Sequence, residues 1–283
     1  MNLHELGVTD IVALIGREDR AVLDAMAAAQ SALARFIEAV EPGFAAGGRL
    51  IYLGAGTSGR LGVLDASEAP PTFAVPPGRI IGIIAGGDGA LRISSEGKED
   101  DADGARAELE SLNITGNDAV LGIAAGGTTP YPRGALAIAR QMAPGCVTGL
   151  LCCSPVEPPP HCDHLIVLLT GAEVLTGSTR MKAGTATKLA LNTISTALMI
   201  RTGRVFQNLM VDVRASNIKL RDRAARIIAS ATGLSREESF AALDEADGQA
   251  KLAIVMVKIG CDRAEAQRRL HASGGRLDSA INA

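Results

Sequence analysis

The chain has 283 residues, of which 47% are hydrophobic but only 2% aromatic, and its formal net charge is −3. This length allows one large domain or two small ones, with a core built from aliphatic side chains. The slightly acidic charge argues against a nucleic-acid-binding surface, and no apolar run reaches about 18 residues, which argues against a membrane-spanning helix.

A parallel α/β sheet is predicted for the larger, N-terminal part of the chain. An Ala-rich stretch with helical spacing, Arg20–Val40, comes first. Short apolar runs that end in Gly or turn residues then predict five buried strands: Leu50–Leu53, Ile80–Ala85, Ala119–Ala125, Cys146–Cys153 and Leu165–Leu169. Longer amphipathic or Ala-rich stretches separate most of them, which indicates helices on both faces of the sheet.

Only helices are predicted after the last strand. A long helical pattern covers Ser178–Thr202, where Ser178 or Thr179 is expected to cap the helix. Four more patterns follow: Arg214–Ala231, Ser235–Asp244, Gln249–Lys258 and Arg263–Leu270, with Ser235 and Glu238 spaced as a capping box. We therefore predict two domains, residues 1–210 and a small helical, UBA-like tail over residues 211–283.

The loop after the first strand is the most informative part of the sequence. It reads Gly54-Ala55-Gly56-Thr57-Ser58 and leads into a helical pattern. Glycines let the backbone approach a ligand, and the free N–H groups of a helix start suit a phosphate. The loop lacks the Lys of a Walker motif and the glycine spacing of the dinucleotide fingerprint. A tight turn with capping hydroxyls is the alternative.

Two further loops follow strand ends. Gly86–Gly87 follows the second predicted strand, and Gly126–Thr129 follows the third. In parallel sheets ligands bind at the carboxyl ends of strands, so the three loops are expected to converge on one site. Thr129 could instead cap the next helix, with Pro130 at its first position.

Two glutamates are candidates for proton transfer. Glu68 follows a mostly apolar helical stretch that Pro70 and Pro71 are expected to end, so partial desolvation could raise its pKa. A solvated carboxylate at a helix end is the alternative. Glu99 lies in the acid-rich stretch Glu96–Glu110, where a charged surface turn is the simpler interpretation.

Two polar clusters point to other ligands. Arg180, Lys182 and Lys188 lie near a helix start, where the helix dipole disfavours cations, so a bound anion or ordinary surface charge could explain them. Cys152, Cys153, His161, Cys162 and His164 fit no common zinc spacing, and we expect no metal site there.

Three motifs resemble the signature of the bacterial N-acetylmuramic acid 6-phosphate etherases. They are Gly54–Phe73, Gly171–Thr185 and Asn208–Val213, and the similarity extends from about residue 10 to 280. The resemblance implies a sugar isomerase (SIS) domain, a three-layer α/β/α sandwich with a parallel sheet, followed by a helical tail. It also implies a homodimer that acts on a small sugar phosphate, with no metal and no organic cofactor.

The resemblance implies that the lactyl ether of the sugar is cleaved by a carbon–oxygen lyase reaction, elimination followed by hydration, in cell-wall recycling. By motif matching, Glu68 corresponds to the acid that protonates the departing lactate, and Glu99 to the second catalytic glutamate. The implied substrate-binding residues are Gly56, Thr57, Ser58, Thr128, Thr129, Glu173, Ser178 and Lys182.

The sequence departs from the family in the second phosphate loop, where Gly126 and Thr128 replace a Ser and an Arg. The Thr-Glu-x-x-Asn element of the family also has no counterpart before Gly7. These departures favour a non-catalytic sugar-phosphate regulator, whereas the two glutamates favour the lyase. An aldose–ketose isomerase would not need the Glu68-Ala-Pro-Pro motif. No basic-then-apolar leader is seen in Met1–Asp10, and five cysteines fit a reducing cytoplasm.

Overall fold

The computed structural model describes residues 2–213, 215 and 217–282. The chain divides into two compact units: Met1–Ser67 with Gly78–Ser195, and Glu68–Pro77 with Thr196–Ala283. The division by packing therefore assigns a short internal segment to the same unit as the C-terminal helices. The domain boundary at residues 210–211 remains a prediction.

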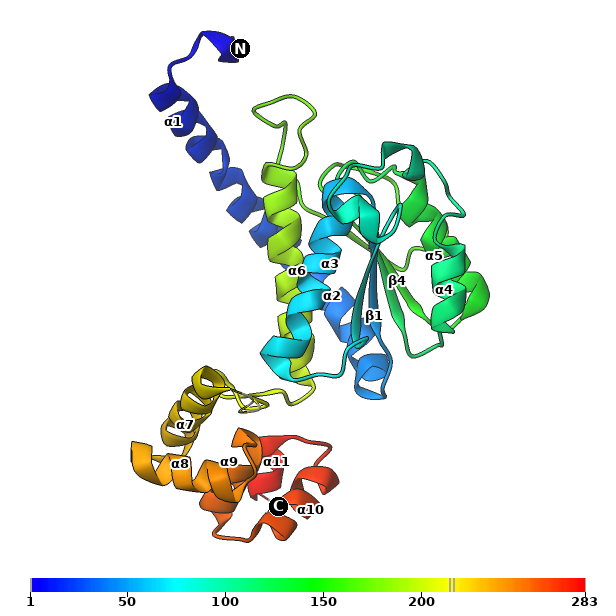
Figure 1. Cartoon of the computed structure of the whole chain (residues 1–283). Helices are drawn as coiled ribbons and strands as arrows, with labels where there is room; N and C mark the ends of the chain where they lie inside the picture. Colours follow the sequence, from blue (N-terminus) through cyan, green and yellow to red (C-terminus); the bar gives the residue numbers. More distant parts are fainter. Residues whose placement is uncertain (1, 214, 216, 283) are drawn as a thin grey trace. The chain divides into compact units, whose positions relative to one another are not determined.

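A five-stranded parallel sheet forms the centre of the first unit (Figure 1). The spatial order is β2-β1-β3-β4-β5. The strands are β1 (Leu50–Gly54), β2 (Ile80–Ile84), β3 (Ala119–Ile123), β4 (Val147–Cys152) and β5 (His164–Val167). All five predicted strands are confirmed, each to within two residues at its ends. Continuous apolar runs give strands buried on both faces, and every residue of β1 and β3 is buried.

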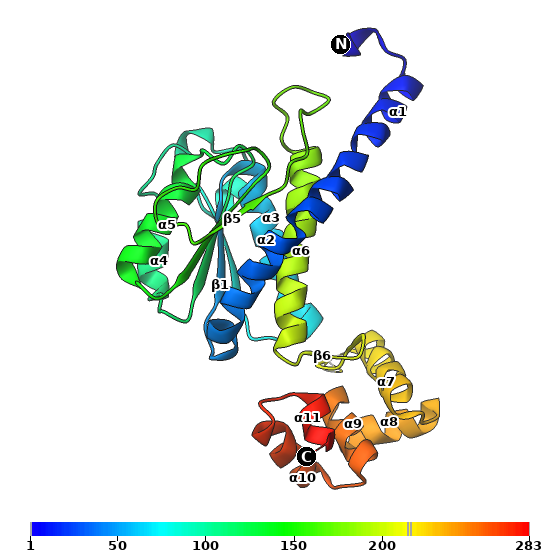
Figure 2. The ribbon, with the colours of Figure 1, turned by 180° about the vertical axis from the view of Figure 1, so that it is seen from behind.

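Helices cover both faces of the sheet (Figures 1 and 2). One face carries α2 (Arg20–Ala45), α3 (Gly56–Phe73) and α6 (Lys182–Arg201), and the other carries α4 (Arg106–Leu112) and α5 (Pro130–Met142). On the first face, Phe36 lies so close to Gly149 that a Cβ there would be 2.9 Å from the ring. On the second, Leu136 belongs to a core cluster with Val120 and Leu150. The predicted three-layer α/β/α sandwich is confirmed.

The helices differ from the prediction in two respects, the end of α3 and the presence of an additional helix. Helix α3 does not end before Pro70 and Pro71 but continues to Phe73 with both prolines inside it. Each proline removes one backbone donor, so the carbonyl oxygens of Ala66 and Ser67 lose their usual partners four residues on, and the helix ends two residues after Pro71. The helix ends at Ala74, whose φ of 49° is left-handed. An additional N-terminal helix, α1 (Val8–Glu18), was not predicted.

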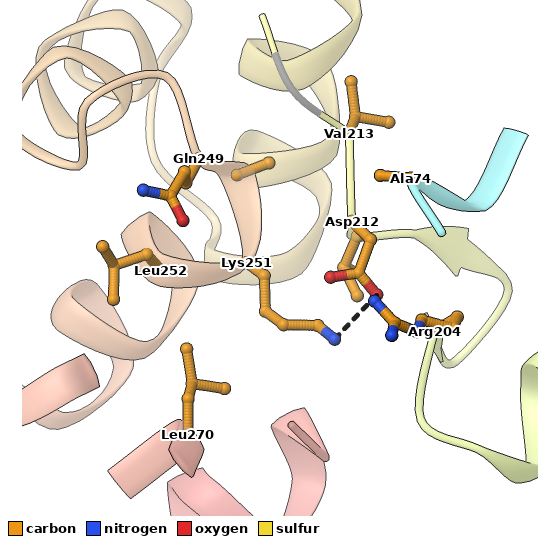
Figure 3. A pocket seen from close by; sticks show the side chains of 10 residues that line it. Ala74, Arg204, Asp212, Val213, Gln249, Lys251, Leu252 and Leu270 are labelled. Atoms are coloured by element: carbon orange, nitrogen blue, oxygen red, sulfur yellow. Dashed lines mark hydrogen bonds and ion pairs between the residues drawn. The ribbon is translucent and has the colours of Figure 1, made fainter. Parts of the chain in front are cut away.

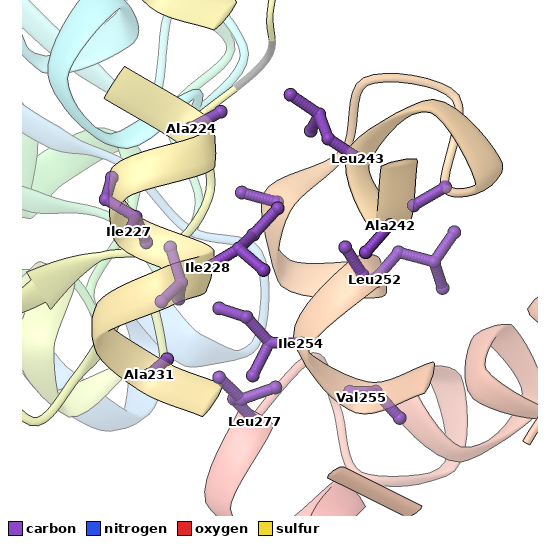
Figure 4. Close-up of a cluster of buried hydrophobic side chains, with 14 of the residues drawn as sticks. Ala224, Ile227, Ile228, Ala231, Ala242, Leu243, Leu252, Ile254, Val255 and Leu277 are labelled. Atoms are coloured by element: carbon purple, nitrogen blue, oxygen red, sulfur yellow. The ribbon is translucent and has the colours of Figure 1, made fainter. Parts of the chain in front are cut away.

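The second unit is helical apart from a short antiparallel pair of strands. Its elements are β6 (Val205–Phe206), β7 (Leu209–Met210), α7 (Ile218–Thr232), α8 (Arg236–Glu245), α9 (Ala250–Ile259), α10 (Arg263–Ala272) and α11 (Leu277–Asn282). The Ser235–Glu238 capping box is confirmed. Arg214, the first residue of one predicted helix, lies outside the described residues. Aliphatic side chains such as Ile228, Ile254 and Leu277 form the core (Figure 4).

None of the helices in the described ranges combines the length and the apolarity that crossing a membrane requires.

Candidate functional site

The loops after β1 and β3 leave the sheet side by side. Strands β1 and β3 are hydrogen-bonded neighbours, and Gly54 at the end of β1 is in register with Ile123 at the end of β3. From β1 the chain crosses to β2 on one side, and β3 to β5 extend on the other. In open parallel sheets, such a reversal of strand order opens a crevice where ligands bind. The structure thus brings the predicted loops Gly54–Ser58 and Gly126–Thr129 together.

The turn from β1 into α3 depends on glycine. A Cβ at Gly59 would lie 2.5 Å from the carbonyl oxygen of Gly54, so helix and strand can approach this closely only without a side chain there. Gly56 begins α3 with a φ of 52°, which glycine adopts without strain. The N–H groups in the first turn of a helix have no partner within it, so this turn presents donors at the crevice.

Four hydroxyl side chains lie in the segments that follow β1 and β3. Thr57 and Ser58 lie in the first turn of α3, and Thr128 and Thr129 precede α5. Within the described part of the chain, none of these hydroxyls makes a hydrogen bond, and none is fully buried. Thr129 occupies the N-cap position of α5 without capping it through its side chain, and Pro130 is the first helical residue, as expected. The hydroxyls are therefore available to a ligand.

The start of α6 also lies at this edge, but it is capped differently from the prediction. Neither Ser178 nor Thr179 caps the helix, because the Glu173 carboxylate accepts hydrogen bonds from the backbone N–H groups of Lys182 (3.1 Å) and Ala183 (2.9 Å). A carboxylate at this position is favoured by the helix dipole. Ser178 lies in the intervening loop, half-buried.

The cations near this helix start divide into two kinds. Lys182 is only 3% exposed, and its Nζ pairs with Glu18 at 2.9 Å. Arg180 and Lys188 are exposed and form no ion pair with described residues. The anion inferred from sequence is thus supplied, at least in part, by Glu18 and Glu173 of the chain itself. The first turn of α6 packs close to the β1 loop, since a Cβ at Gly184 would lie 3.5 Å from the Thr57 methyl group.

The two candidate glutamates occupy different surroundings. Glu99 is half-buried just after a short 3-10 turn, and its carbonyl oxygen accepts a hydrogen bond from the Tyr131 N–H at 3.0 Å. Glu68 is exposed, so the expected partial desolvation is wrong for a single chain. The apolar side of α3 carries Gly62, Ala66 and Ala69, and Glu68 lies off that row.

Arg60 holds the chain segment that leads to Glu99. Its Nε donates to the carbonyl oxygen of Leu91 at 3.0 Å, and its Nη2 to that of Ala90 at 2.7 Å. Arg60 is part of the family-like motif, but its partners are carbonyl groups thirty residues away, which no local pattern reveals.

A polar pocket of about 340 Å³ adjoins this segment in the first unit. Tyr131 lines it together with Lys98, Asp101 and Glu108. The Tyr131 hydroxyl is the buried side-chain group without a hydrogen-bond partner among the residues that the structure describes. Burial, with Glu108 and Asp101 nearby, raises the pKa of this hydroxyl. No local pattern in the sequence singles out Tyr131, because its burial follows only from the packing of α4 and α5.

The cysteine and histidine cluster shows no metal-binding geometry. Among the residues in the described ranges, no group of three or more His, Cys, Asp or Glu side chains could hold an ion. The Cys152 thiol bonds instead to the carbonyl oxygen of Ser154, and that of Cys162 to the carbonyl oxygen of His164. Burial raises the pKa of Cys153 to about 11, so this thiol stays protonated at neutral pH.

A second polar pocket, of about 120 Å³, lies within the helical unit (Figure 3). Lys251 is 9% exposed, and its Nζ donates three hydrogen bonds, to the Asp212 carboxylate and to the carbonyl oxygens of Gly203 and Gly275. Asp212 also faces Arg204 at 3.6 Å. Because every donor of Lys251 is used within the protein, this cluster joins the segment after β7 to the helices and gives Asp212 of the Asn208–Val213 motif a structural role.

Comparison with known proteins gives consistent results. Residues 32–140 match a family model described as the glucokinase regulatory protein N-terminal SIS domain. The chain is 49% identical, over 99% of its length and 94% of the relative, to the N-acetylmuramic acid 6-phosphate etherase of Serratia proteamaculans (strain 568). It is 50% identical, over 100% of its length and 89% of the relative, to the protein of the same name in Synechococcus sp. (strain CC9605).

The fold has solved counterparts. A chain from Bacteroides fragilis NCTC 9343, named as a phosphosugar isomerase involved in capsule formation, superposes with a TM-score of 0.51 at 19% identity. The match covers 71% of this chain and 94% of the other. Identity this low supports the SIS-type fold and nothing about chemistry.

Proposed function

The chain belongs to the N-acetylmuramic acid 6-phosphate etherase family, and on that basis we propose that it cleaves the D-lactyl ether of N-acetylmuramic acid 6-phosphate. The products are N-acetylglucosamine 6-phosphate and D-lactate. The chain is thus a carbon–oxygen lyase of cell-wall amino-sugar recycling. The observation that carries the assignment to a site is the set of unpartnered hydroxyls where β1 and β3 end.

The 6-phosphate is proposed to bind at this crevice. The N–H groups of Gly56 and the following residues begin α3, and the hydroxyls of Thr57, Ser58, Thr128 and Thr129 add donors. A phosphomonoester accepts several hydrogen bonds and is stabilised by the positive end of a helix dipole. This donor set contains no cation from the second loop, since Thr128 stands where the family usually has Arg. Backbone N–H groups and side-chain hydroxyls are therefore proposed to supply most of the hydrogen bonds to the phosphate.

The beginning of α6 is proposed to complete the sugar site. Ser178 offers a further hydroxyl from the loop, and Glu173 and Lys182 take part in substrate binding by fixing that loop to the helix start. Their bonds to Ala183 and Glu18 leave the loop little freedom to shift.

The proposed mechanism assigns one proton transfer to each glutamate. In the open-chain sugar, the C1 aldehyde acidifies the C2 proton, which the Glu99 carboxylate removes as base. The electron pair left on C2 forms the C2–C3 double bond as the C3–O bond breaks. Glu68 donates a proton to the departing lactate oxygen. Water then adds across the double bond: its oxygen bonds to C3 as a new hydroxyl group while Glu68, now a carboxylate, accepts the proton that the water loses, and Glu99 returns its proton to C2, so both glutamates regain their starting states. General acid and base catalysis each contribute roughly 10²–10⁴-fold.

The assay is D-lactate release from N-acetylmuramic acid 6-phosphate, with a chelator present to test that no metal is needed. Glu68→Gln and Glu99→Gln should each lower turnover by about 10²-fold or more. Glu110→Gln, an exposed acid on α4, is the matched control and should retain full activity. Normal release by Glu68→Gln would remove it from the mechanism. Tight binding of the sugar phosphate without any lactate release would instead favour a regulator.

We also propose that the protein works as a cytoplasmic homodimer. Two-fold dimers are the commonest symmetric assemblies, and the exposure of Glu68 in one chain leaves it free to meet a second chain. All five cysteines are free thiols, which suits a reducing compartment. Light scattering at working concentration tests the dimer, and cell fractionation with a thiol-accessibility label tests the compartment.

A further inference from the structure

The two loops of the proposed phosphate site contain no positive charge. Neither Gly54–Ser58 nor Gly126–Thr129 includes a lysine or an arginine. A phosphate monoester carries a charge of about −1.5 to −2 at neutral pH. Hydrogen bonds from a cation to such a group are shorter and stronger than those from neutral donors. A cation from another part of the chain is therefore expected at the crevice.

Two basic side chains close to these loops are already engaged within the chain. Arg60, just after the first loop, donates to the carbonyl oxygens of Ala90 and Leu91 at 2.7 and 3.0 Å. Lys182, at the start of α6, is buried, and its Nζ pairs with the Glu18 carboxylate at 2.9 Å. Neither side chain can turn to a ligand without breaking these contacts.

Arg133, which follows the second loop, belongs to the other layer. It lies on α5, which covers the opposite face of the sheet from α3 and α6 (Figures 1 and 2). Its Nη1 donates to the carbonyl oxygen of Gly127 at 3.3 Å. Burial raises the pKa of the Cys162 thiol, and nearby Arg133 partly offsets this rise, so the guanidinium lies near the segment that leads into β5. Arg133 is therefore turned toward β4 and β5, away from β1.

Arg180 and Lys188, on the α6 side of the crevice, have no protein partner among the described residues, and both are exposed. Arg180 lies in the loop that leads from β5 into α6 (Figures 1 and 2). Lys188 lies in the second turn of the helix. Because α6 runs away from the carboxyl edge of the sheet, Arg180 is the nearer of the two to the loops.

The start of α6 places Arg180 beside the first turn of α3. A Cβ at Gly184 would lie 3.4 Å from the carbonyl oxygen of Thr179 and 3.5 Å from the methyl group of Thr57. These three residues therefore lie side by side, and Arg180 directly follows Thr179. A guanidinium on a long, exposed side chain can reach from this position to the N–H groups and hydroxyls that begin α3.

The backbone around Arg180 is held in place, although its side chain is free. The Gly184 N–H donates to the carbonyl oxygen of Thr179 at 2.9 Å. The Glu173 carboxylate accepts hydrogen bonds from two N–H groups at the helix start. The cation is thus carried by an ordered turn, so its binding to a ligand requires the ordering of one side chain and no rearrangement of the loop.

We propose, on the basis of the function proposed above, that Arg180 is the cation of the phosphate site and binds the 6-phosphate together with the hydroxyls of the two loops. The planar fork of a guanidinium matches two phosphate oxygens. Arg180 is therefore a specificity-determining residue: it favours a phosphorylated sugar over the same sugar with a neutral hydroxymethyl group. It does not touch the atoms that react.

Kinetics of Arg180→Met test this role. The KM for N-acetylmuramic acid 6-phosphate should rise by about 10-fold or more, as expected when charge-assisted hydrogen bonds are lost. The kcat should change little, because the phosphate is bound equally before and during the reaction. Inorganic phosphate, used as a competitive inhibitor, should bind more weakly by a similar factor. Arg92→Met removes another exposed arginine without a partner among the described residues, and as the matched control it should leave both constants unchanged.

Moving the cation to the second loop gives a sharper test. Thr128→Arg introduces a guanidinium on the other side of the crevice. In the double variant Arg180→Met/Thr128→Arg, the KM and the inhibition by inorganic phosphate should return toward the wild-type values. A structural role of Arg180 in its loop would not be rescued by a charge at another position, so a KM that stays raised in the double variant would overturn the proposal. Circular dichroism checks that each variant is folded.

The remaining outcomes separate this inference from the proposed reaction. An unchanged KM in Arg180→Met, or a larger rise in Lys188→Met, would overturn the assignment to Arg180 and leave the lyase standing. A wild type that releases no lactate, but binds inorganic phosphate in calorimetry more tightly than Arg180→Met does, would overturn the reaction and leave the phosphate site standing.

Discussion

The two edges of the central sheet are built in opposite ways. At the edge where the strands begin, which we call the amino edge, the buried carboxylate of Asp118 has hydrogen-bond partners for both of its oxygens. The Asp118 carboxylate accepts from Arg49 Nη2 at 2.8 Å and Nε at 2.9 Å, and from the backbone N–H groups of Arg49 and Thr115 at 2.7 Å each. At the carboxyl edge, the hydroxyls of Thr57 and Ser58 have no partner among the described residues.

This difference separates stability from function. Arg49 and Asp118 immediately precede β1 and β3, so their ion pair holds the two central strands at the end away from the crevice. Burial alone would raise the pKa of Asp118, but the Arg49 guanidinium and the two backbone N–H groups outweigh it and lower the pKa. The hydroxyls at the other edge are not fully buried, so water can bond to them at little cost in stability, and they remain available to a ligand.

Removing the charge at the amino edge is expected to have the largest effect. Asp118→Asn leaves the Arg49 guanidinium partly buried without its counter-ion, which should cost about 3–5 kcal/mol of unfolding free energy. Denaturant titration measures it. Asp163→Asn, the control at the same edge, alters a carboxylate whose side chain is 43% exposed and should cost clearly less. Equal losses would contradict the dependence on burial.

The same pair makes a prediction about acid. Because folding lowers the pKa of Asp118, its contribution is present above the unfolded value of about 3.9 and is lost as the pH falls through the folded value. The gap in stability between wild type and Asp118→Asn should therefore be constant near neutral pH and shrink below about pH 4. A stability difference between wild type and Asp118→Asn that increased on acidification would contradict a lowered pKa of Asp118.

Loosening the carboxyl edge should affect turnover more than stability. Arg60→Lys replaces a planar group that bonds two carbonyls with one that cannot span both, so the segment leading to Glu99 loses its fixed position. We expect turnover to fall by about 10-fold with a small change in unfolding free energy. Arg92→Ala, an exposed arginine on the same segment, is the control. Equal turnover in both variants would remove the positioning role.

The smallest expected effect concerns a hydroxyl at the carboxyl edge. Tyr131→Phe removes a buried group without a partner in the described part of the chain and should raise the unfolding free energy by about 1 kcal/mol. The control is Tyr52→Phe, because the buried Tyr52 hydroxyl donates to Asp65 at 3.0 Å. That change should instead destabilise by about 1–2 kcal/mol. If the unfolding free energy rose in both variants or fell in both, the contrast between the unbonded hydroxyl of Tyr131 and the bonded hydroxyl of Tyr52 would be contradicted.

Much of the fold could be predicted from local patterns. The five strands were found because apolar runs between glycines leave no other role for those residues, and the Ser235 capping box because its two partners are three residues apart. The loop after β1, which we propose binds the phosphate, was predicted from neighbouring residues in the same way. Helix α1 was missed although its apolar residues, among them Val8, Val12 and Ile15, recur at helical spacing.

Contacts between distant residues could not be predicted in this way. From the sequence, a bound anion was one explanation for Lys182 near the helix start. In the structure, the carboxylate of Glu18, 164 residues earlier, forms the ion pair with Lys182. Glu173 caps α6 from nine residues before it, beyond the reach of the usual capping signals. Glu99 gained its proposed role only from the resemblance to a family, since its own surroundings in the sequence indicate a surface turn.

The sequence by itself determined where the strands run, which loops carry hydroxyls and glycines, and which family the chain resembles, because these depend on neighbours within a few residues. The tertiary structure decided which of those loops meet, which charges are already paired, and which hydroxyls remain free. Parallel strands bring residues from distant parts of the chain to one edge, and burial then sets the cost of leaving any of them unbonded.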